Sequence, residues 1–372
     1  MTSLWLSADP EPRRPPLEAD ASADVVIVGG GIAGVATALA VAERGASVVL
    51  LEGRGIAHGA SGRNAGFVLA GVTENFAAAC LRYGEDRAWR VWEVTRRNRV
   101  LLRDAVERHG IACDLRWSGS LQLAGDGTEW EEIRRGADDL RSRGVAVTVD
   151  EALRAACYAE DGEVDPVRLV RGLARAAEAV GVRIHEDSDV LSVDAHTARA
   201  ARGTVRAASV VVCTNAYTSH LLSLRVRPVR GQMLATGPAP RRYFERPTYA
   251  NRGYRYWRQT LEGRILVGGW RDLAPDVEVG LQEDPTPTIQ AALESSLVEQ
   301  GIDAPVTHRW AGIMGFSHDG LPYVGRQGSG PFVAAGFTGH GMGFALAAAE
   351  IVAAAVAGRA HADAELFDPD RA

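Results

Sequence analysis

The sequence predicts an α/β protein with two domains, a Rossmann-type domain and an α+β domain built around an inserted antiparallel sheet. The first observation is a buried strand at Val25–Val28, a glycine-rich turn, an alanine-rich helix at Val35–Arg44 and a second buried strand at Val48–Glu52, a βαβ unit of about 30 residues. The second is the apolar run Val210–Cys213, typical of a strand buried on both faces. The third is Arg225–Asp272, rich in arginine and aromatic residues, with two predicted antiparallel strands.

The other elements follow from hydrophobic periodicity and turn signals. The first half of the chain is predicted to contain a glycine-rich loop at Gly53–Gly66, a long helical region from about Glu74 to His109, a strand at Leu121–Leu123, a charged and solvated helix at Trp130–Arg143, a helix at Asp165–Val180, and strands at Val182–Ile184, Val190–Val193 and Ser209–Cys213. The second half is predicted to contain antiparallel strands at Tyr249–Trp257 and Arg264–Trp270, a helix at Ile289–Glu299, strands within Trp310–Gly325 and Pro331–Gly336, and a final helix at Phe344–Ala357.

Because strands of the Rossmann type recur late in the chain, we expect that domain to be discontinuous. It is predicted to comprise residues 21–75, 155–222 and 308–372, with the substrate domain formed by residues 76–154 and 223–307. Residues 1–20 are polar and contain several prolines, which predicts an extended N-terminal arm.

The composition argues against several classes of protein. A net charge of −6, from 41 basic and 47 acidic residues, offers no basic face for nucleic acid. The cysteines at positions 80, 113, 157 and 213 form no closely spaced pair, so no metal site is predicted and a cytoplasmic location is the natural reading. No apolar segment of leader length lies near the N-terminus, and Phe344–Ala357 is too short to span a membrane.

The turn Gly29–Gly34 has the pattern G-x-G-x-x-G directly between a buried strand and a helix. This is the context in which the pattern binds a dinucleotide, with the diphosphate held by the positive end of the helix. Gly29 permits the tight turn, Gly31 lets the backbone approach the diphosphate, and Gly34 lets helix and strand pack closely. Glu52 ends the second strand, where a carboxylate accepts hydrogen bonds from ribose hydroxyls.

Several further motifs follow this turn in a fixed order along the chain. They are Gly59–Gly66 (GASGRNAG), Val229–Gln232, Gly263–Gly269, Gly312–Gly315 with Asp319–Gly325, and Gly339–Gly343. Together with Asp24–Glu52, these segments resemble the FAD-dependent D-amino acid oxidase and sarcosine oxidase family, in particular its γ-glutamylputrescine oxidoreductase-like branch. The resemblance covers nearly the whole chain and extends to the Leu4–Leu6 start. It implies that FAD is the cofactor and that a small-molecule amine or amino acid is oxidised by hydride transfer, giving an imine that hydrolyses.

The resemblance also implies which residues contact FAD. The loop Ser61–Gly66 would pass over the diphosphate and the flavin ring, with Arg63 and Asn64 as hydrogen-bond donors. The turn Gly336–Gly343 would direct the positive end of the final helix toward the flavin and stabilise the reduced ring. The predicted cofactor-binding residues are Gly29, Gly31, Ile32, Ala33, Gly34, Glu52, Gly53, Ser61, Gly62, Arg63, Asn64, Ala65, Gly66, Val190, Thr214, Gly312, Met314, Gly336, Thr338, Gly339, His340, Gly341 and Met342.

The flavin is predicted to be bound non-covalently. Relatives that attach it covalently use a cysteine in the region of Gly312–Ser317 or a histidine near the position of Arg63, and this sequence has neither. His58 lies near the second position and keeps covalent attachment open as an alternative.

The substrate is expected to contact the second domain. Tyr254, Tyr256 and Arg258 alternate along one predicted strand and therefore share a face. With Trp270, they would offer aromatic faces and a cation to an amine that carries a carboxylate. Tyr256, Arg258 and His340 are the candidate catalytic residues, although a purely structural role for His340 is equally open. No general base is assigned, because hydride removal from a neutral amine does not require one.

The electron acceptor is open between oxygen and another oxidant. All 41 basic residues are arginine, whereas sarcosine-type oxidases place a lysine beside the flavin to promote the reaction with oxygen. Positive charge would have to come from Arg255, Arg258 or His340, or the enzyme would be a dehydrogenase with another acceptor. A further alternative is an FAD-binding subunit of a hetero-oligomeric oxidoreductase. A monooxygenase using NADPH has less support, because the sequence has no second G-x-G-x-x-G motif.

Overall fold

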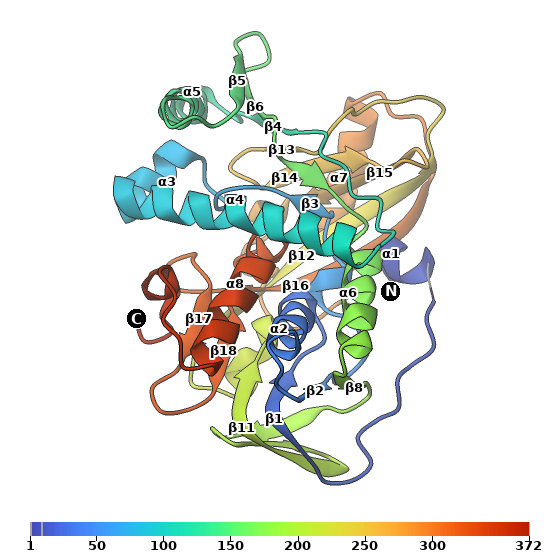
Figure 1. The fold of residues 1–372 in the computed structure, drawn as a ribbon. Coiled ribbons are helices and arrows are strands. Elements are labelled where there is room, and N and C mark those ends of the chain that lie inside the picture. The colour runs from blue at the N-terminus through green and yellow to red at the C-terminus, as the bar shows by residue number, and fades with distance from the viewer. Residues whose placement is uncertain (1, 9, 372) are drawn as a thin grey trace.

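The computed structural model describes residues 2–8 and 10–371, which fold around two eight-stranded sheets (Figure 1). The first sheet has the order β17-β18-β11-β1-β2-β8, and β10 and β9 extend it from β11. At its centre, β1 pairs in parallel with both β2 and β11, which confirms that the Val210 region returns to the Rossmann sheet. The strands are β1 (Ala21–Val28), β2 (Val48–Leu51), β8 (Arg183–His185), β9 (Val190–Val193), β10 (Thr197–Ala200), β11 (Gly203–Val212), β17 (Tyr323–Arg326) and β18 (Phe332–Ala335).

Three helices cover one face of the first sheet. They are α2 (Ile32–Ala42), α6 (Pro166–Ala179) and α8 (Gly341–Val356), and their alanine, valine and leucine side chains share one apolar core with β1 and β2. Asp165 caps α6 by accepting hydrogen bonds from the backbone N–H groups of Val167 and Arg168, each at 3.0 Å. Pro166 lies in the first turn, as predicted.

The second sheet has the order β16-β12-β15-β14-β13-β4-β6-β5 and is antiparallel except where β13 meets β4. Helix α7 (Pro287–Glu299) packs Ile289, Leu293 and Leu297 against it. Its strands are β4 (Ser120–Leu123), β5 (Val147–Asp150), β6 (Ala155–Tyr158), β12 (Arg227–Pro238), β13 (Thr248–Ala250), β14 (Arg255–Gln259), β15 (Arg264–Gly269) and β16 (Val306–Phe316). The short strands β3 (Phe67–Val68) and β7 (Gly162–Glu163) pair separately.

Two of the predicted domain boundaries disagree with the sheets. The strand β6 begins at Ala155, and β16 spans the boundary predicted at residue 308, yet both strands belong to the second sheet. β16 pairs along β12 from Arg227–Phe316 to Thr236–Val306. A continuous apolar run does not distinguish a strand of a parallel sheet from one buried in an antiparallel sheet, so the sequence placed β16 with the wrong partners.

The N-terminal arm is also not extended throughout. Residues Leu4–Ala8 form helix α1, and its residues Leu4, Trp5 and Leu6 are buried in the main core. The Trp5 Nε1–H donates to the Asn64 carbonyl at 2.8 Å, and the Ser3 hydroxyl donates to the Gly62 carbonyl at 2.6 Å. The apolar triplet therefore docks on the loop at residues 60–66, whereas residues 10–20 form neither helix nor strand.

Several elements differ in detail from the prediction. The region from Glu74 to His109 is two helices, α3 (Phe76–Tyr83) and α4 (Glu85–Arg108), separated at Gly84, whose φ is 83°. The predicted solvated helix is α5 (Gly127–Ser142), and its apolar face is buried with Trp130, Ile133, Ala137 and Leu140. Tyr249–Trp257 comprises the end of β13, a turn and the start of β14 rather than one strand, because Asn251 and Arg252 have φ values of 51° and 53°.

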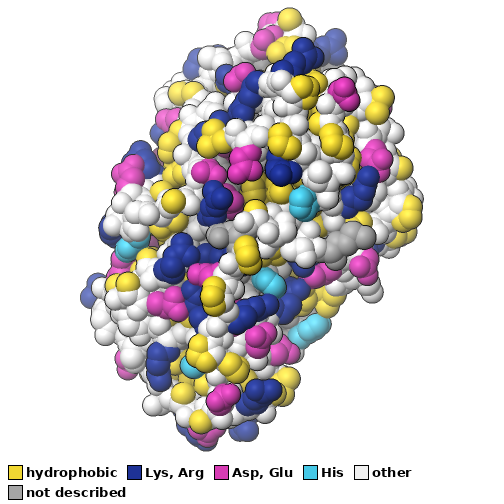
Figure 2. Space-filling view, turned by 90° about the vertical axis from the view of Figure 1, so that its right-hand side faces the viewer, with side chains coloured by type: hydrophobic (Ala, Val, Ile, Leu, Met, Phe, Trp, Pro, Cys, Tyr) yellow, Lys and Arg dark blue, Asp and Glu magenta, His cyan; other side chains and the backbone are white. Residues whose placement is uncertain are grey.

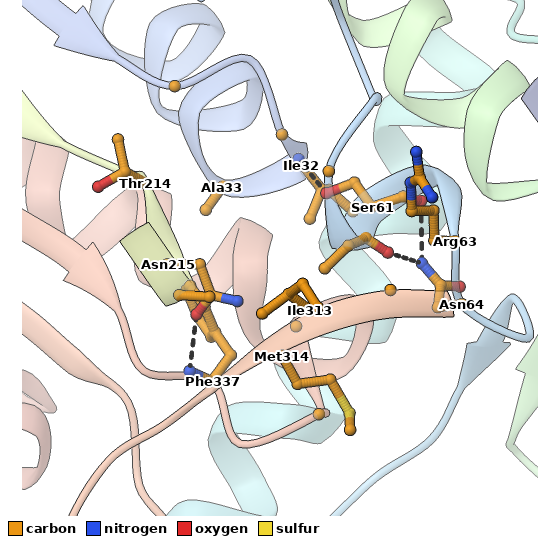
Figure 3. Close-up of a pocket in the computed structure, with 18 of the residues that line it drawn as sticks. Ile32, Ala33, Ser61, Arg63, Asn64, Thr214, Asn215, Ile313, Met314 and Phe337 are labelled. Atoms are coloured by element: carbon orange, nitrogen blue, oxygen red, sulfur yellow. Dashed lines mark hydrogen bonds between the residues drawn. The ribbon is translucent and has the colours of Figure 1, made fainter. Parts of the chain in front are cut away.

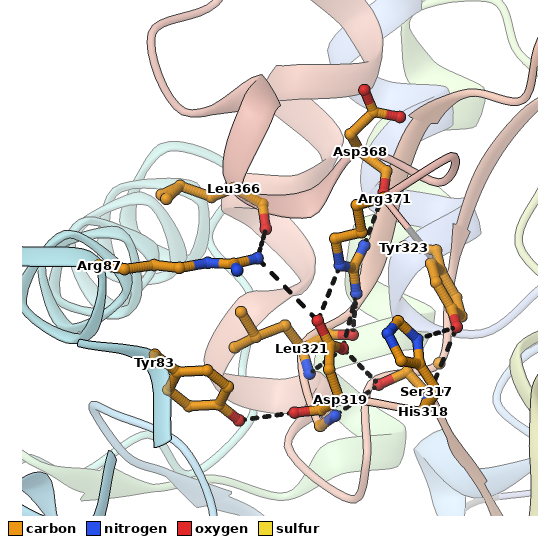
Figure 4. A network of polar contacts seen from close by, with 12 residues as sticks. Tyr83, Arg87, Ser317, His318, Asp319, Leu321, Tyr323, Leu366, Asp368 and Arg371 are labelled. Atoms are coloured by element: carbon orange, nitrogen blue, oxygen red, sulfur yellow. Dashed lines mark hydrogen bonds and ion pairs between the residues drawn. The ribbon is translucent and has the colours of Figure 1, made fainter. Parts of the chain in front are cut away.

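A polar network fastens the C-terminal segment to the rest of the molecule (Figure 4). The carboxylate of Asp319 pairs with Arg371, with Nε–Oδ2 at 2.9 Å, and the Asp319 carbonyl accepts a hydrogen bond from Tyr83 at 2.8 Å. Arg87 lies 4.0 Å from the same carboxylate and donates to the Leu366 carbonyl. The loop that connects β16 to β17 is thereby held by α3, α4 and the C-terminus.

The surface seen in Figure 2 carries basic and acidic side chains in alternation, without a large area of one sign. Among the described residues, no helix is long and apolar enough to cross a bilayer.

Candidate active site

A cavity of about 640 Å³ lies where the two sheets meet. One end is lined by the turn after β1, by Glu52 and by Val190, all from the first sheet. The other end is lined by residues of the second sheet and its turns, including Tyr249, Tyr256 and Arg271. We refer to these as the Rossmann end and the β14 end of the cavity.

The turn Gly29–Gly34 forms the floor of the Rossmann end, and α2 begins within it at Ile32. Gly29 has a φ of 111°, and a Cβ on Gly34 would lie 1.9 Å from the Gly29 carbonyl oxygen. The N-cap residue of α2 is Gly31, which provides no side-chain cap. The Ile32 N–H donates to Ser61 Oγ at 2.9 Å. The open helix start therefore presents backbone N–H groups and positive potential to an anion.

Glu52 borders the Rossmann end at the C-terminal end of β2. Its carboxylate accepts backbone hydrogen bonds from Gly30 at 2.6 Å and from Arg54 at 2.8 Å. Burial raises the pKa of Glu52, and these two hydrogen bonds oppose that shift. The carboxylate is thus fixed in place at the end of the second strand, where the fingerprint predicts a ribose partner.

The loop at residues 59–66 covers the cavity between its two ends, and Figure 3 shows its side chains around Ser61. The Asn64 side-chain amide donates to the carbonyls of Ala60 and Ser61 and accepts from the Gly66 N–H at 2.7 Å. Arg63 donates to the carbonyls of His58 and Ala311 and pairs with Glu283 at 3.0 Å. The two predicted donors line the cavity, but these contacts also fix the conformation of the loop.

The helix α8 starts at the opposite wall. Its N-cap is His340, which makes no side-chain cap, and the preceding Thr338 has a φ of 49°. The His340 Nδ1 lies 3.2 Å from the Thr73 hydroxyl. Burial lowers the pKa of His340, and the charge of Arg271 lowers it further, although a hydrogen bond from the imidazole to the Thr338 backbone and the charge of Glu74 oppose this. The imidazole is therefore held toward its neutral form.

Most of the predicted cofactor-binding residues line this one cavity. Those that do are Gly29, Gly31, Ile32, Ala33, Glu52, Gly53, Ser61, Arg63, Asn64, Ala65, Val190, Thr214, Gly312, Met314, Thr338, Gly339, His340, Gly341 and Met342. Gly34, Gly62, Gly66 and Gly336 do not, because each is a point of close packing behind the wall: a Cβ on Gly62 would lie 2.3 Å from the Ala57 carbonyl oxygen, and one on Gly66 would lie 2.2 Å from that of Val164.

Arg258 does not face the cavity, contrary to the prediction. Its guanidinium is 2.9 Å from the Glu163 carboxylate and donates to the carbonyls of Ala65, Gly66 and Val164. The ring of Trp5 lies 5.3 Å from its central carbon. Alternation along a strand predicts which residues share a face. It does not reveal that the loop at residues 59–66 covers the face that carries Arg258.

Tyr256 does line the β14 end, as predicted, whereas Tyr254 and Trp270 do not. Burial raises the pKa of Tyr256 to about 12, so its hydroxyl stays protonated at neutral pH. Sequence reasoning missed several lining residues, namely Arg54, Phe67, Leu69, Thr73, Asn215, Tyr217, Tyr249, Arg271, Ile313 and Phe316. Tyr249 and Arg271 belong to the same aromatic and arginine-rich segment as Tyr256, which is the one sequence signal that points to them.

The fold and this cavity define a protein of the dinucleotide-binding class, with a cavity that reaches from a Rossmann turn to the second sheet. The model of the family "FAD dependent oxidoreductase" matches residues 24–355. The γ-glutamylputrescine oxidoreductase of Escherichia coli (strain K12) is 28% identical over 93% of this chain and 85% of its own length. The probable oxidoreductase OrdL of Haemophilus influenzae is 26% identical over 92% of this chain and 85% of its own length. The structure of glycine oxidase from Geobacillus kaustophilus superposes with a TM-score of 0.80 at 25% identity, covering 95% of this chain and 99% of that one.

The chain therefore belongs to the FAD-dependent oxidoreductase family, and FAD is its cofactor. The cavity fits this cofactor, because an open helix start and a fixed carboxylate lie at one end and an enclosed wall with aromatic side chains at the other.

Proposed function

We propose that this chain oxidises the C–N bond of an amine or amino acid, giving an imine that water hydrolyses. The observation that carries the proposal is the continuity of the cavity from the Rossmann turn to Tyr249 and Tyr256 of the second domain. Among the relatives, the γ-glutamylputrescine oxidoreductase and the glycine oxidase are named for amine and amino acid substrates. When bound, FAD supplies the chemistry by accepting a hydride from the carbon next to the amine nitrogen.

The residues of the Rossmann end would hold FAD without a covalent bond. We assign the diphosphate to the N–H groups at the start of α2 and the adenosine ribose to Glu52. Cys213 is among the lining residues, and burial raises the pKa of its thiol to about 12, which leaves it protonated and unreactive. His58 is not among the lining residues. Acid denaturation should therefore release all of the yellow colour from the protein, and colour retained in the precipitate would contradict this assignment.

The residues of the β14 end would orient the substrate and exclude water. His340 and Tyr256 are two lining groups that can form hydrogen bonds to the amine nitrogen, His340 toward its neutral form and Tyr256 as a protonated phenol. Neither is a strong base at neutral pH, so we propose that they select a neutral amine. Orientation of the reacting C–H bond by such groups reduces the entropic part of the barrier.

Anaerobic mixing of the FAD-loaded protein with a panel of amines and amino acids tests the proposal. The expected result is loss of the visible absorption of oxidised flavin with at least one class of compound. If no amine or amino acid bleaches the flavin while dithionite does, the chain is an FAD-binding subunit and the proposed reaction is wrong.

The absence of lysine supports a second candidate, a dehydrogenase that passes electrons to an acceptor other than oxygen. The flavin is reduced with one equivalent of the active substrate, and its reoxidation is then followed in air. Reoxidation as fast as turnover supports an oxidase, whereas reoxidation much slower than turnover with an artificial acceptor supports the dehydrogenase.

We also propose a cytoplasmic location. The four cysteines are free, and two of them, Cys113 and Cys213, are buried without a disulfide partner. Such thiols suit a reducing compartment, and cell fractionation with a tagged chain is the direct test.

A further inference from the structure

A small polar cluster surrounds the imidazole of His340 where α8 begins. The Thr73 hydroxyl oxygen lies 3.2 Å from His340 Nδ1 and donates to the Thr338 carbonyl oxygen at 3.4 Å. The imidazole also forms a hydrogen bond to the Thr338 backbone. All three residues line the cavity. The cluster thus joins the loop before α3 to the turn before α8.

Contacts on two sides hold Thr73 in place. Earlier in the same loop, the Gly71 N–H donates to the Thr95 hydroxyl at 2.7 Å. A Cβ on Gly253 would lie 3.2 Å from the Thr73 methyl carbon, so the turn after β13 packs against the apolar side of this residue. With its methyl group against that turn, Thr73 directs its hydroxyl toward His340.

The Thr338 carbonyl is also fixed, and the backbone there is strained. Thr338 has a φ of 49°, a left-handed value that a β-branched residue rarely adopts. Its N–H donates to the Gly315 carbonyl at 2.8 Å, and its hydroxyl donates to the Gly336 carbonyl at 3.2 Å. Backbone strain of this kind persists where surrounding contacts impose it, and it is frequent at functional sites. Here it places a carbonyl beside the imidazole of His340.

These contacts select one tautomer of the imidazole. A carbonyl oxygen can only accept a hydrogen bond, and the Thr73 hydroxyl accepts one when its own hydrogen is directed to Thr338. Nδ1 therefore carries the hydrogen of the neutral ring, which leaves Nε2 with a free lone pair. Among the described residues, no group forms a hydrogen bond with Nε2. A hydrogen-bond acceptor is thus available at the wall of the cavity.

The surroundings of the ring favour its neutral form. Burial lowers the pKa of His340, and the cation of Arg271 lowers it further. The bond to Thr338 and the charge of Glu74 act in the opposite direction, but the Glu74 carboxylate is paired with Arg82. The neutral imidazole is the form in which Nε2 accepts a hydrogen bond.

From this geometry, we propose that Thr73 is a positioning residue for His340, whose Nε2 accepts an N–H group of the substrate. The reacting group of the substrate is then a primary or secondary amine, because a neutral tertiary amine has no N–H to donate. The inference rests on the proposed function, which it deepens by naming the substrate class.

The hydrogen bond to Nε2 would strengthen as the reaction proceeds. The carbon beside the nitrogen loses a hydride, whose two electrons pass to the flavin as in the proposed function. The nitrogen lone pair forms the second bond of the C=N group, while the N–H bond stays intact. The nitrogen thereby gains positive charge, so its N–H becomes a stronger donor to Nε2. A contact that is stronger in the transition state than in the bound substrate increases the rate of the chemical step.

Matched amines that differ in N-methylation test the substrate class. The FAD-loaded protein is mixed anaerobically with benzylamine, N-methylbenzylamine and N,N-dimethylbenzylamine, with the corresponding butylamines, and with glycine, sarcosine and N,N-dimethylglycine. If none of these reacts, N-methylated forms of an amine that bleaches the flavin in the wider panel take their place. We expect the tertiary amine of a reacting series to bleach the flavin at least about tenfold more slowly than its primary or secondary counterpart, as loss of one charge-assisted hydrogen bond implies.

Variants at position 73 assign the discrimination to the cluster. Thr73→Val keeps the shape of the side chain but removes the hydroxyl, so the limiting rate with primary and secondary amines should fall by about three- to tenfold. The Kd should change less, and the rate with tertiary amines should not change. Thr73→Ser keeps the hydroxyl and should restore the parent rate. Thr128→Val is the matched control, because Thr128 is exposed on α5 and is not among the lining residues.

NMR of the FAD-loaded protein with isotope-labelled histidine nitrogens determines the tautomer without turnover. His340→Leu identifies the His340 signals by their loss. We expect Nε2 of the parent to have the chemical shift of an unprotonated ring nitrogen and Nδ1 that of a protonated one. In Thr73→Val, both shifts should move toward the average of the two tautomers. Each variant is used only if its FAD content equals that of the parent.

The outcomes separate this inference from the proposed function. If tertiary amines bleach the flavin as fast as their secondary counterparts, the substrate class is wrong although the proposed oxidation stands. If Nε2 carries the hydrogen in the parent, or if Thr73→Val changes neither the tautomer nor the rates, Thr73 does not position His340. If no amine bleaches the flavin, the proposed oxidation and the substrate class fail together, and the NMR shifts alone decide whether Thr73 fixes the tautomer.

Discussion

The two ends of the cavity differ in how their polar side chains are bonded. At the Rossmann end and along the loop at residues 59–66, which we call the covering loop, these side chains form hydrogen bonds within the protein. At the β14 end, the Arg271 guanidinium lies against aromatic rings. Glu52 accepts two backbone hydrogen bonds, and Asn64 forms three within its own loop. Among the described residues, the Arg271 guanidinium forms neither a hydrogen bond nor an ion pair. Side chains whose hydrogen bonds are formed within the protein keep a fixed position, as a site for a permanently bound cofactor requires. The Arg271 guanidinium, in contrast, lines the cavity and lies against the rings of Tyr254 and Phe316.

Arg258 and Arg271 allow this comparison within one residue type. Substitution of Arg258 should lower the free energy of unfolding strongly, and substitution of Arg271 should hardly change it. Arg258→Gln breaks a buried ion pair with Glu163 and removes hydrogen bonds to the Ala65 and Gly66 carbonyls. We expect the free energy of unfolding to fall by about 3–5 kcal/mol. Arg271→Gln removes no ion pair and should change it by less than about 0.5 kcal/mol. Urea unfolding of the FAD-loaded variants measures both values, and equal losses would remove the distinction between the two ends.

The close packing behind the Rossmann turn leads to the second prediction. Gly34→Ala places a Cβ 1.9 Å from the Gly29 carbonyl oxygen, a contact that only a shift of the turn can relieve. The turn is the floor on which the diphosphate would rest, so we expect a loss of about 1–3 kcal/mol in stability and of most bound FAD. The ratio of flavin to protein after gel filtration measures this. Gly127→Ala is the control, because a Cβ there meets nothing within 4 Å, and retention of full FAD by Gly34→Ala would refute the assignment.

The sequence predicted the Rossmann end much better than the β14 end, for a physical reason. The turn Gly29–Gly34 and Glu52 are local to one βαβ unit, so their spacing along the chain already determines their spacing in space. The β14 end combines Tyr249, Arg271 and His340 from segments that only the tertiary fold brings together. The alternation of Tyr256 and Arg258 was read correctly as a strand, but the docking of a loop on one of its faces depends on long-range contacts with residues 65, 66 and 164.

Helix α1, where the sequence predicted an extended arm, provides a smaller test of how the covering loop is held in place. Trp5→Phe keeps an aromatic ring beside Arg258 but removes the 2.8 Å hydrogen bond from Nε1 to the Asn64 carbonyl. We expect a loss of about 1 kcal/mol in stability and faster dissociation of FAD, measured by the recovery of free-flavin fluorescence on dilution. Ser7→Ala in the same helix is the comparison variant, because it removes the contacts of the Ser7 hydroxyl with the Leu4 carbonyl and His308 but leaves the bond from Trp5 to the loop in place. Unchanged FAD dissociation in Trp5→Phe would show that α1 does not support the loop.

The ion pairs above the covering loop provide the smallest expected effect, one that depends on pH. The carboxylate of Glu283 joins Arg54 at 2.7 Å to Arg63 at 3.0 Å, and it also accepts a hydrogen bond from Tyr217. Burial alone would raise the pKa of Glu283. The hydrogen bond from Arg54 and the charges of Arg54 and Arg63 outweigh burial and hold that pKa below its usual value. A carboxyl group with a lowered pKa contributes stability that is fully present above the pH at which free glutamate titrates and is lost as the pH falls through its folded pKa.

Replacement of this carboxylate should therefore matter only above that acidic range. We expect Glu283→Gln to cost about 1 kcal/mol or less at neutral pH, since the group is partly screened by solvent, and the difference from the parent to vanish as the pH falls below the usual glutamate range. Urea midpoints recorded at a series of pH values measure this. Glu262→Gln, which removes an exposed carboxylate, is the matched control. A Glu283→Gln difference that is constant with pH would show that the bridge does not titrate with folding.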